Sequence, residues 1–309
     1  MRFTIFIIAC VLLVACQPGH ITEIPVNPPR LVINAQAEDG LPWAVYVSHT
    51  YPLLDTLGNY PNAPGGVPGA SVKLFDGDQL IEELTPTGQP DQMQAFVSSN
   101  GPVPGHTYTI RAEAPDFNPV SASYTHPSPV DLDDVTFEVT QSEIYSQNSD
   151  FATIAFSLNI NVTFTDPPGD NYYQVVITKS SGPDPATSTI ATEDYLFSQL
   201  PENQQNFNNG QGTLLDDHKF AGQKVTLPFR GSFLSSRIVA DTVETPYLSL
   251  TLRTLSKEYY DFRVYLNNWG PSYYDPYAQP AIVKTNVVGG LGIFAGYAKK
   301  RRTTYLGLP

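Results

Sequence analysis

The sequence predicts a mainly β protein with two β-sandwich domains, the first of them immunoglobulin-like or transthyretin-like. Two observations support this prediction. The 309 residues include 28 Pro, 22 Gly, 18 Tyr and 16 Phe, a composition that favours turns and aromatic-rich strands over helices. Short runs of alternating apolar and polar residues also recur between turn signals along most of the chain. No repeat with a period of roughly 20 to 50 residues is present, which disfavours a solenoid or a propeller.

Residues 1–15 have the pattern of an export signal. Arg2 precedes an apolar run over residues 3–15, which has the length of a secretory signal core and is too short to span a bilayer as a helix. The run leads into Cys16 through the letters LVAC, which resemble the bacterial lipobox. We therefore expect cleavage before Cys16, attachment of lipid to its sulfur, and loss of Cys10 with the signal peptide. The alternatives are a secreted protein with an incidental Cys16, or a retained signal with a disulfide between the two cysteines.

The residues after Cys16 predict delivery to the outer membrane. Gln17 stands where some lipoproteins carry an aspartate that retains them at an inner membrane. The lipid chains would anchor the protein at about 0.8 kcal/mol per buried methylene. We expect a lipid-anchored protein at the cell surface, with Glu23 as the one acidic residue near the anchor. The formal net charge of −13 argues against nucleic acid as a partner.

The remaining chain is predicted to form a tether and two β-rich domains. Residues 16–29 are rich in proline and lack periodicity, which is typical of a spacer. Residues 30–127 are expected as the N-terminal immunoglobulin-like sandwich, and residues 128–309 as the C-terminal sandwich. The boundary falls in THPSPVDLDDV, residues 125–135, where proline and acidic residues cluster. Seven runs are expected as strands of the first domain: RLVINAQAE, WAVYVSHTY, ASVKLFD, QLIEEL, QAFVSS, TYTIRAEA and SASYTH.

The second domain is predicted to contain a long β-hairpin. The run FATIAFSLNINVTFTD alternates for longer than an average strand, and residues 166–170 turn the chain into NYYQVVITK. Residues 180–213 are polar and are expected as a surface excursion, before strands at QKVTLPF, YLSLTLRTLS and FRVYLNN. The run SKEYYDFRVYLNNW fits both a strand and a helix. We expect a short helix over residues 256–263 with Ser256 as its cap.

Aromatic residues in NNWGPSYYDPYAQP form the candidate ligand or partner surface. Trp269, Tyr273, Tyr274 and Tyr277 stand among prolines and asparagines, and aromatic side chains on a rigid loop bind with little loss of entropy. The alternative is that these side chains plug the end of a sandwich. Whether the ligand is a small molecule, a peptide or a glycan is left open.

Patterns for catalysis and metal binding are missing from the sequence. The five histidines show neither metal-ligand spacing nor a cysteine partner, and no G-x-S-x-G or phosphate-binding loop is present. Acidic clusters at residues 131–134 and 216–217 carry the oxygen ligands that calcium takes, but neither has a recognised loop pattern. We therefore expect no enzyme activity, no catalytic residue, no metal and no cofactor.

The string NVVGGLGIFAGYAKKRR is the most distinctive in the chain. Its four glycines predict tight turns or a close approach to another strand. Residues 299–302 are all basic. They are expected as part of a solvated last strand, with contact to lipid phosphates as the alternative.

Several of these motifs, in this order, resemble one known family. The lipobox, RLVINA, PGASV, FTDPPGDNYY, SKEYY and the terminal GGLGIFAGY together resemble the Bacteroidetes lipoprotein family catalogued as domain of unknown function 4249. The resemblance covers nearly the whole chain after the signal. It implies a two-domain β lipoprotein encoded beside TonB-dependent outer-membrane transporters, and it assigns no catalytic residue.

The expected function follows from the lipobox, the β-rich composition and this resemblance. We expect a non-enzymatic outer-membrane lipoprotein that binds a TonB-dependent barrel and takes part in nutrient uptake. The alternative is a structural or assembly scaffold of the outer-membrane envelope machinery. A scaffold would have protein partners but no small ligand.

Overall fold

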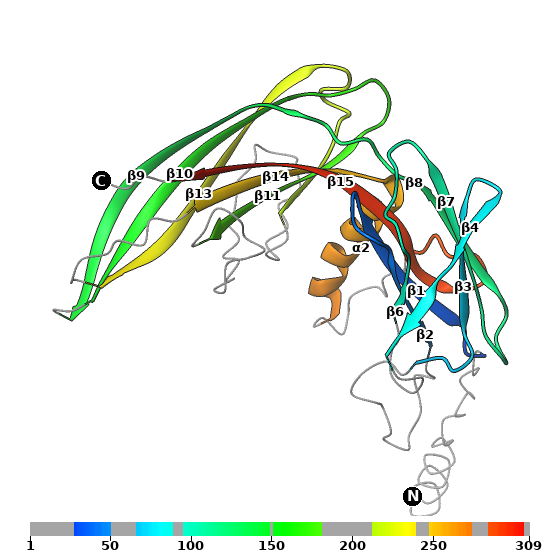
Figure 1. The fold of residues 1–309 in the computed structure, drawn as a ribbon. Helices are drawn as coiled ribbons and strands as arrows, with labels where there is room; N and C mark the ends of the chain where they lie inside the picture. The colour runs from blue at the N-terminus through cyan, green and yellow to red at the C-terminus, as the bar shows by residue number, and fades with distance from the viewer. Residues whose placement is uncertain are drawn as a thin grey trace, which may run out of the picture.

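The computed structural model describes residues 28–50, 66–88, 95–148, 151–180, 212–238, 247–273 and 284–305, and the protein is mainly β (Figure 1). The strands are β1 (Leu31–Glu38), β2 (Ala44–His49), β3 (Ser71–Asp76), β4 (Gln79–Glu83), β5 (Thr85–Thr87), β6 (Ala95–Val97), β7 (Thr107–Glu113), β8 (Val120–Thr125), β9 (Leu132–Asn148), β10 (Phe151–Thr165), β11 (Tyr172–Ser180), β12 (Thr213–Asp216), β13 (Lys224–Ile238), β14 (Tyr247–Leu255) and β15 (Leu291–Tyr305). The helix α2 spans Lys257–Tyr273. All the strands expected in the first domain form, and the short β5 joins them. The predicted fold class is confirmed.

The strands form three sheets that pack as two sandwiches. An eight-stranded sheet has the order β12-β11-β14-β15-β1-β2-β6-β5, a four-stranded sheet the order β4-β3-β7-β8, and a three-stranded sheet the order β13-β10-β9. The four-stranded sheet covers one end of the large sheet, and the three-stranded sheet covers the other end (Figure 1). Since successive side chains of a strand point to opposite faces, each sandwich buries about every second residue between its sheets.

The first hydrophobic core lies between β1 and β2 on one side and β3, β7 and β8 on the other. Ile33 of β1 is fully buried at its centre. Trp43 meets Tyr108 edge to face, with 4.7 Å between ring centroids. Phe294 of β15 meets Tyr124 in the same way at 4.8 Å. A side chain from the last strand therefore completes the core of the first sandwich.

Strand β15 connects the two sandwiches, because it pairs with a strand of each within the large sheet. Residues 291–297 pair in parallel with β1, and residues 297–305 pair antiparallel with β14. At Gly292 the two strands approach so closely that a Cβ atom would lie 1.8 Å from the carbonyl oxygen of Ile33. The φ angle of Gly292 is 108°, which favours glycine. The close approach predicted from the glycine-rich string is confirmed.

The hairpin predicted for FATIAFSLNINVTFTD and NYYQVVITK is wrong. Strand β10 pairs with β9 and β13 in the three-stranded sheet, whereas β11 pairs with β12 and β14 in the large sheet. Asp166 anchors the crossing between the sheets, because it is buried and accepts hydrogen bonds from the Tyr173 hydroxyl and from Gly222 N at 2.7 Å. Phe164 and Tyr173 then meet in the second core from opposite sheets, with 5.0 Å between ring centroids.

Helix α2 is longer than the short helix expected over residues 256–263. Ser256 caps it as predicted, since its Oγ accepts a hydrogen bond from Tyr259 N at 3.3 Å. The strand predicted at FRVYLNN is wrong, because these residues lie within α2. The helix packs its apolar side chains on the face of the large sheet opposite the three-stranded sheet (Figure 1). Within the described residues, no helix has the length and apolar character needed to cross a membrane.

Candidate functional site

The predicted aromatic surface lies at and beyond the C-terminal end of α2. Trp269 and Tyr273 belong to the last turns of the helix, where the backbone is described but the side chains are not. Tyr274, Tyr277 and the predicted lipidation residue Cys16 lie outside the described residues. The structure therefore places two of the four aromatic residues on one helix and defines what supports that helix.

Aromatic contacts hold the first turns of α2 on the sheet. Tyr259 is 3% exposed and meets the Tyr297 ring of β15 edge to face, with 5.3 Å between centroids. Tyr260 packs on Tyr172 of β11, with 4.8 Å between ring centroids, and its hydroxyl donates a hydrogen bond to Asp216 Oδ2 at 3.3 Å. Because these contacts reach several strands of one sheet, the helix has a fixed base. Its C-terminal end points away from the sheet (Figure 1).

A charged network lies on the same face of the sheet, beside α2. The Tyr297 hydroxyl donates to Glu38 Oε2 at 2.6 Å, and Lys299 forms an ion pair with the same carboxylate. The Arg253 guanidinium lies 4.6 Å from the centroid of the Tyr297 ring and donates to Gln174 Oε1 at 3.1 Å. Burial pushes the pKa of Glu38 upward, but hydrogen bonds from Lys299 and Tyr297 outweigh burial, so this pKa lies below its ordinary value. The network fixes the strands beneath the helix.

Sequence reasoning did not single out this network. Tyr297 and Lys299 are two positions apart in β15, and strand alternation alone places them on one face. Their partner Glu38 lies on β1, near the other end of the chain. The missing information was the pairing of these two strands, which no local pattern encodes.

The acidic turn and the basic run seen in the sequence neutralise each other. The ion pairs join Lys300 to Asp131 at 2.8 Å, Arg302 to Asp134 at 3.7 Å and Lys224 to Asp133 at 3.2 Å. These side chains are largely exposed, so the pairs contribute little to stability. Lys299 pairs instead with Glu38 beside the helix. Residues 299–302 therefore lie in a strand, as expected, and form no single basic patch that could favour lipid phosphates.

The second acidic cluster is also engaged by protein groups. Asp217 is buried and accepts a hydrogen bond from Asn171 N at 2.8 Å. Asp216 accepts a hydrogen bond from the Tyr260 hydroxyl and contacts the His218 ring. Across the described ranges, no group of three or more His, Cys, Asp or Glu residues is arranged to hold a metal ion. The carboxylates in this cluster stabilise a turn and the base of α2.

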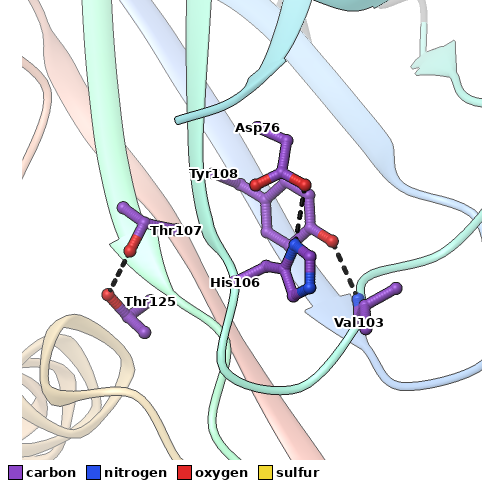
Figure 2. A network of polar contacts seen from close by, with 6 residues as sticks. All are labelled: Asp76, Val103, His106, Thr107, Tyr108 and Thr125. Atoms are coloured by element: carbon purple, nitrogen blue, oxygen red, sulfur yellow. Dashed lines mark hydrogen bonds and ion pairs between the residues drawn. The ribbon is translucent and has the colours of Figure 1, made fainter. Parts of the chain in front are cut away.

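His106 and Asp76 form a polar contact at one end of the first sandwich (Figure 2). The His106 Nδ1 atom lies 2.7 Å from Asp76 Oδ2, and the ring stacks on Tyr108 with 6.2 Å between centroids. The buried Tyr108 hydroxyl accepts a hydrogen bond from Val103 N at 2.9 Å, and burial raises the pKa of Tyr108. The contact ties the end of β3 to the start of β7, which is a structural role.

These features define a class of protein in which two β-sandwiches share one sheet and a helix docks on the outer face of that sheet. The chain belongs to the family described as "Domain of unknown function (DUF4249)", whose model matches residues 20–303. The family resemblance seen in the sequence is thus confirmed.

The remaining comparisons add no further relationship. No curated protein matches the chain. Among solved structures, the chain is similar to a mutant of Salmonella alpha-2-macroglobulin, with 11% sequence identity and a TM-score of 0.25. The match covers 94% of this chain and 15% of that chain. A likeness at this TM-score carries no argument about fold or function.

Proposed function

We propose that the protein is an outer-membrane lipoprotein, anchored through Cys16, that binds a TonB-dependent transporter and takes part in nutrient uptake without catalysing a reaction. The LVAC sequence at the expected cleavage point and the family membership support the anchor and the setting. The binding role is supported mainly by the way in which α2 is held on the large sheet. Its base is fixed on the sheet, while its last turns carry Trp269 and Tyr273.

A fixed helix suits this role for an energetic reason. Ordering side chains and loops at an interface costs roughly 0.5–1.5 kcal/mol for each immobilised flexible side chain. Trp and Tyr residues on a preformed support avoid much of this cost and are enriched among the residues that dominate binding energy. The aromatic segment, which consists of Trp269 and Tyr273 on the last turns of α2 together with Tyr274 and Tyr277, therefore has the composition of an interaction surface.

The alternative role, a scaffold for envelope machinery, has a separate observation in its favour. Strands β9, β10 and β13 contain 17, 15 and 15 residues, whereas typical strands have about 5–6. The outer strands of this sheet are β13 and β9, and long outer strands offer backbone groups for pairing with another chain. A scaffold would use these edges rather than the aromatic segment.

A pull-down from native outer membranes in mild detergent tests the proposal, with the bound proteins identified by mass spectrometry. We expect the wild-type protein to recover a stoichiometric TonB-dependent barrel. Joint substitution of Trp269, Tyr273, Tyr274 and Tyr277 by alanine is expected to abolish recovery without changing the melting temperature. Tyr46→Ala is the matched control, since this exposed tyrosine lies on β2.

Two results of the pull-down would contradict the proposal, one its transporter partner and the other its contact surface. Recovery of assembly proteins in place of a barrel would favour the scaffold, and recovery of the barrel by the fourfold variant would exclude the aromatic segment as the contact. The anchor is tested separately with an alkyne-bearing fatty acid supplied to growing cells. The label is expected on the wild-type protein and not on Cys16→Ala.

A further inference from the structure

A cleft of about 170 Å³ opens beside the first turns of α2, at the opposite end of the helix from the aromatic segment. One wall comes from α2 and the other from the segment that precedes β15, and the lining is mixed polar and apolar. Its lining residues are Glu258, Asp261, Phe262, Lys284, Thr285, Asn286 and Ile293. An engineered protein cavity of about 150 Å³ holds a benzene molecule. The cleft is therefore of a size for a ligand of about six to eight heavy atoms.

The walls of the cleft are preformed. The Asn286 side chain donates to the carbonyl oxygens of Phe294 at 2.7 Å and Ser123 at 3.1 Å, and it accepts a hydrogen bond from Phe294 N at 3.0 Å. Ile293 is 2% exposed and packs in the cluster beneath α2. Ser256 caps the helix that forms the other wall. A ligand would enter this cleft with little rearrangement of the protein.

Unpaired charges of opposite sign face the cleft from its two walls. Among the described residues, the side chains of Glu258 and Lys284 make no hydrogen bond or ion pair, either with each other or with a third group. The other carboxylate of the lining, Asp261, is held by Lys257 at 2.7 Å. Thr285 Oγ1 accepts a hydrogen bond from Val287 N at 3.1 Å, which leaves its hydroxyl proton to donate. The cleft thus offers an anion on one wall, and a cation and a donor on the other.

We propose that this cleft binds a small zwitterion that carries one ammonium group and one carboxylate, of which a free α-amino acid is the simplest. The ammonium group binds Glu258, and the carboxylate binds Lys284 and the Thr285 hydroxyl. Charge-assisted hydrogen bonds of this kind are about twice as strong as neutral ones. Phe262 and Ile293, the apolar residues of the lining, contact a short aliphatic side chain. The proposal goes beyond the proposed function, because this binding step requires neither the lipid anchor nor a barrel.

Isothermal titration of the full-length lipidated protein in detergent micelles tests the site. The probes are glycine, L-alanine and L-leucine, with N-acetyl-L-alanine lacking the ammonium group and L-alanine amide lacking the carboxylate. We expect at least one free amino acid to bind with a dissociation constant between about 10 μM and 1 mM. Each blocked derivative of alanine is expected to bind at least about tenfold more weakly.

Substitutions assign each contact. Glu258→Gln is expected to remove the preference for alanine over N-acetyl-alanine, and Lys284→Met the preference for alanine over its amide. Glu83→Gln and Lys219→Met are matched controls at exposed positions away from the cleft, and both preferences are expected to persist in them. Thermal melts establish that each variant is folded, and Glu258→Asp is a second variant that retains the charge and partial binding.

Two results would overturn the proposal. One is the absence of saturable binding by any free amino acid up to about 10 mM. The other is equal binding of the blocked and free forms by the wild-type protein. Neither result bears on the pull-down, so failure of the amino-acid site and failure of the transporter role are distinguishable.

Discussion

The buried ring of His126 makes the stability of the protein depend on pH. Its side chain is fully buried, and its Nδ1 atom lies 3.2 Å from the Tyr124 hydroxyl. Within the described residues, its Nε2 atom has no hydrogen-bond partner. Burial lowers the pKa of His126 from 6.5 to about 4, because the charged ring would lose its hydration without gaining a counter-ion. The folded protein therefore keeps His126 neutral in a pH range in which the unfolded chain protonates it.

The sign and size of the effect follow from linkage. Between pH 6.5 and about 4 the unfolded state binds a proton at His126 and the folded state does not, so the free energy of unfolding falls as the pH falls. Above pH 6.5 the His126 ring is neutral in both states, so the free energy of unfolding suffers no loss from this residue. A pKa shift of this size corresponds to a loss of about 3 kcal/mol by pH 4. This is a large fraction of the 5–15 kcal/mol that is typical of a folded protein, roughly a fifth to three fifths.

Urea unfolding of the wild-type protein and His126→Phe at several pH values between 4.5 and 7.5 measures the effect. The free energy of unfolding is plotted against pH for each protein. The difference between the two slopes reports on His126, since the other titrating groups are common to both proteins. We expect the wild-type free energy of unfolding to lose up to about 1.4 kcal/mol more per pH unit than that of the variant below pH 6. His126→Asn is a second variant, which retains an acceptor for the hydroxyl of Tyr124. Parallel curves for all three proteins would refute the reasoning.

Three further predictions concern stability and are checked by urea unfolding at pH 7. Gly292→Ala is expected to lower the free energy of unfolding by about 3 kcal/mol or more, because its Cβ would overlap a carbonyl oxygen of β1. The control Gly40→Ala has a positive φ but open space around it, and it should cost about 1 kcal/mol. Equal losses in the two variants would contradict the close approach. Ser256→Ala is expected to lower it by about 1 kcal/mol through loss of the helix cap, and no change would argue against the cap. Tyr173→Phe is expected to lower it by roughly 1–3 kcal/mol, because the buried Asp166 carboxylate loses a donor, and a neutral outcome would show that this hydrogen bond does not stabilise the crossing.

Strand positions were predictable because alternation is a local property. In β1 and β7 the side chains that point into the core and those that point outward alternate along the sequence, and the structure buries them accordingly. The helix cap was predictable for a similar reason, since Ser256 acts on residues only three positions ahead. These features depend on a few neighbouring residues, so a single sequence contains the information that specifies them.

Strand pairing and the charge network could not be predicted from the same patterns. The alternation in FATIAFSLNINVTFTD does not specify a partner, and β11, the strand that follows β10, was the wrong choice, because β10 pairs with β9 and β13. The glycines near Gly292 signalled a close approach without naming β1 as the strand approached. Glu258 and Lys284 face one cleft only because α2 folds back onto β15. Each of these features depends on contacts between distant parts of the chain.

Gly296 of β15 is the point at which the first sandwich meets the helix. A Cβ atom there would lie 2.7 Å from the Tyr124 hydroxyl and 2.8 Å from His126 Nδ1. On the backbone of the same residue, the carbonyl oxygen accepts a hydrogen bond of 2.9 Å from Ser256 N, next to the start of α2. Displacement of His126 would therefore move β15 at the position that holds the cap of the helix. Since the cleft and the helix turns that carry Trp269 and Tyr273 both depend on α2, the packing of the first sandwich influences the position of both.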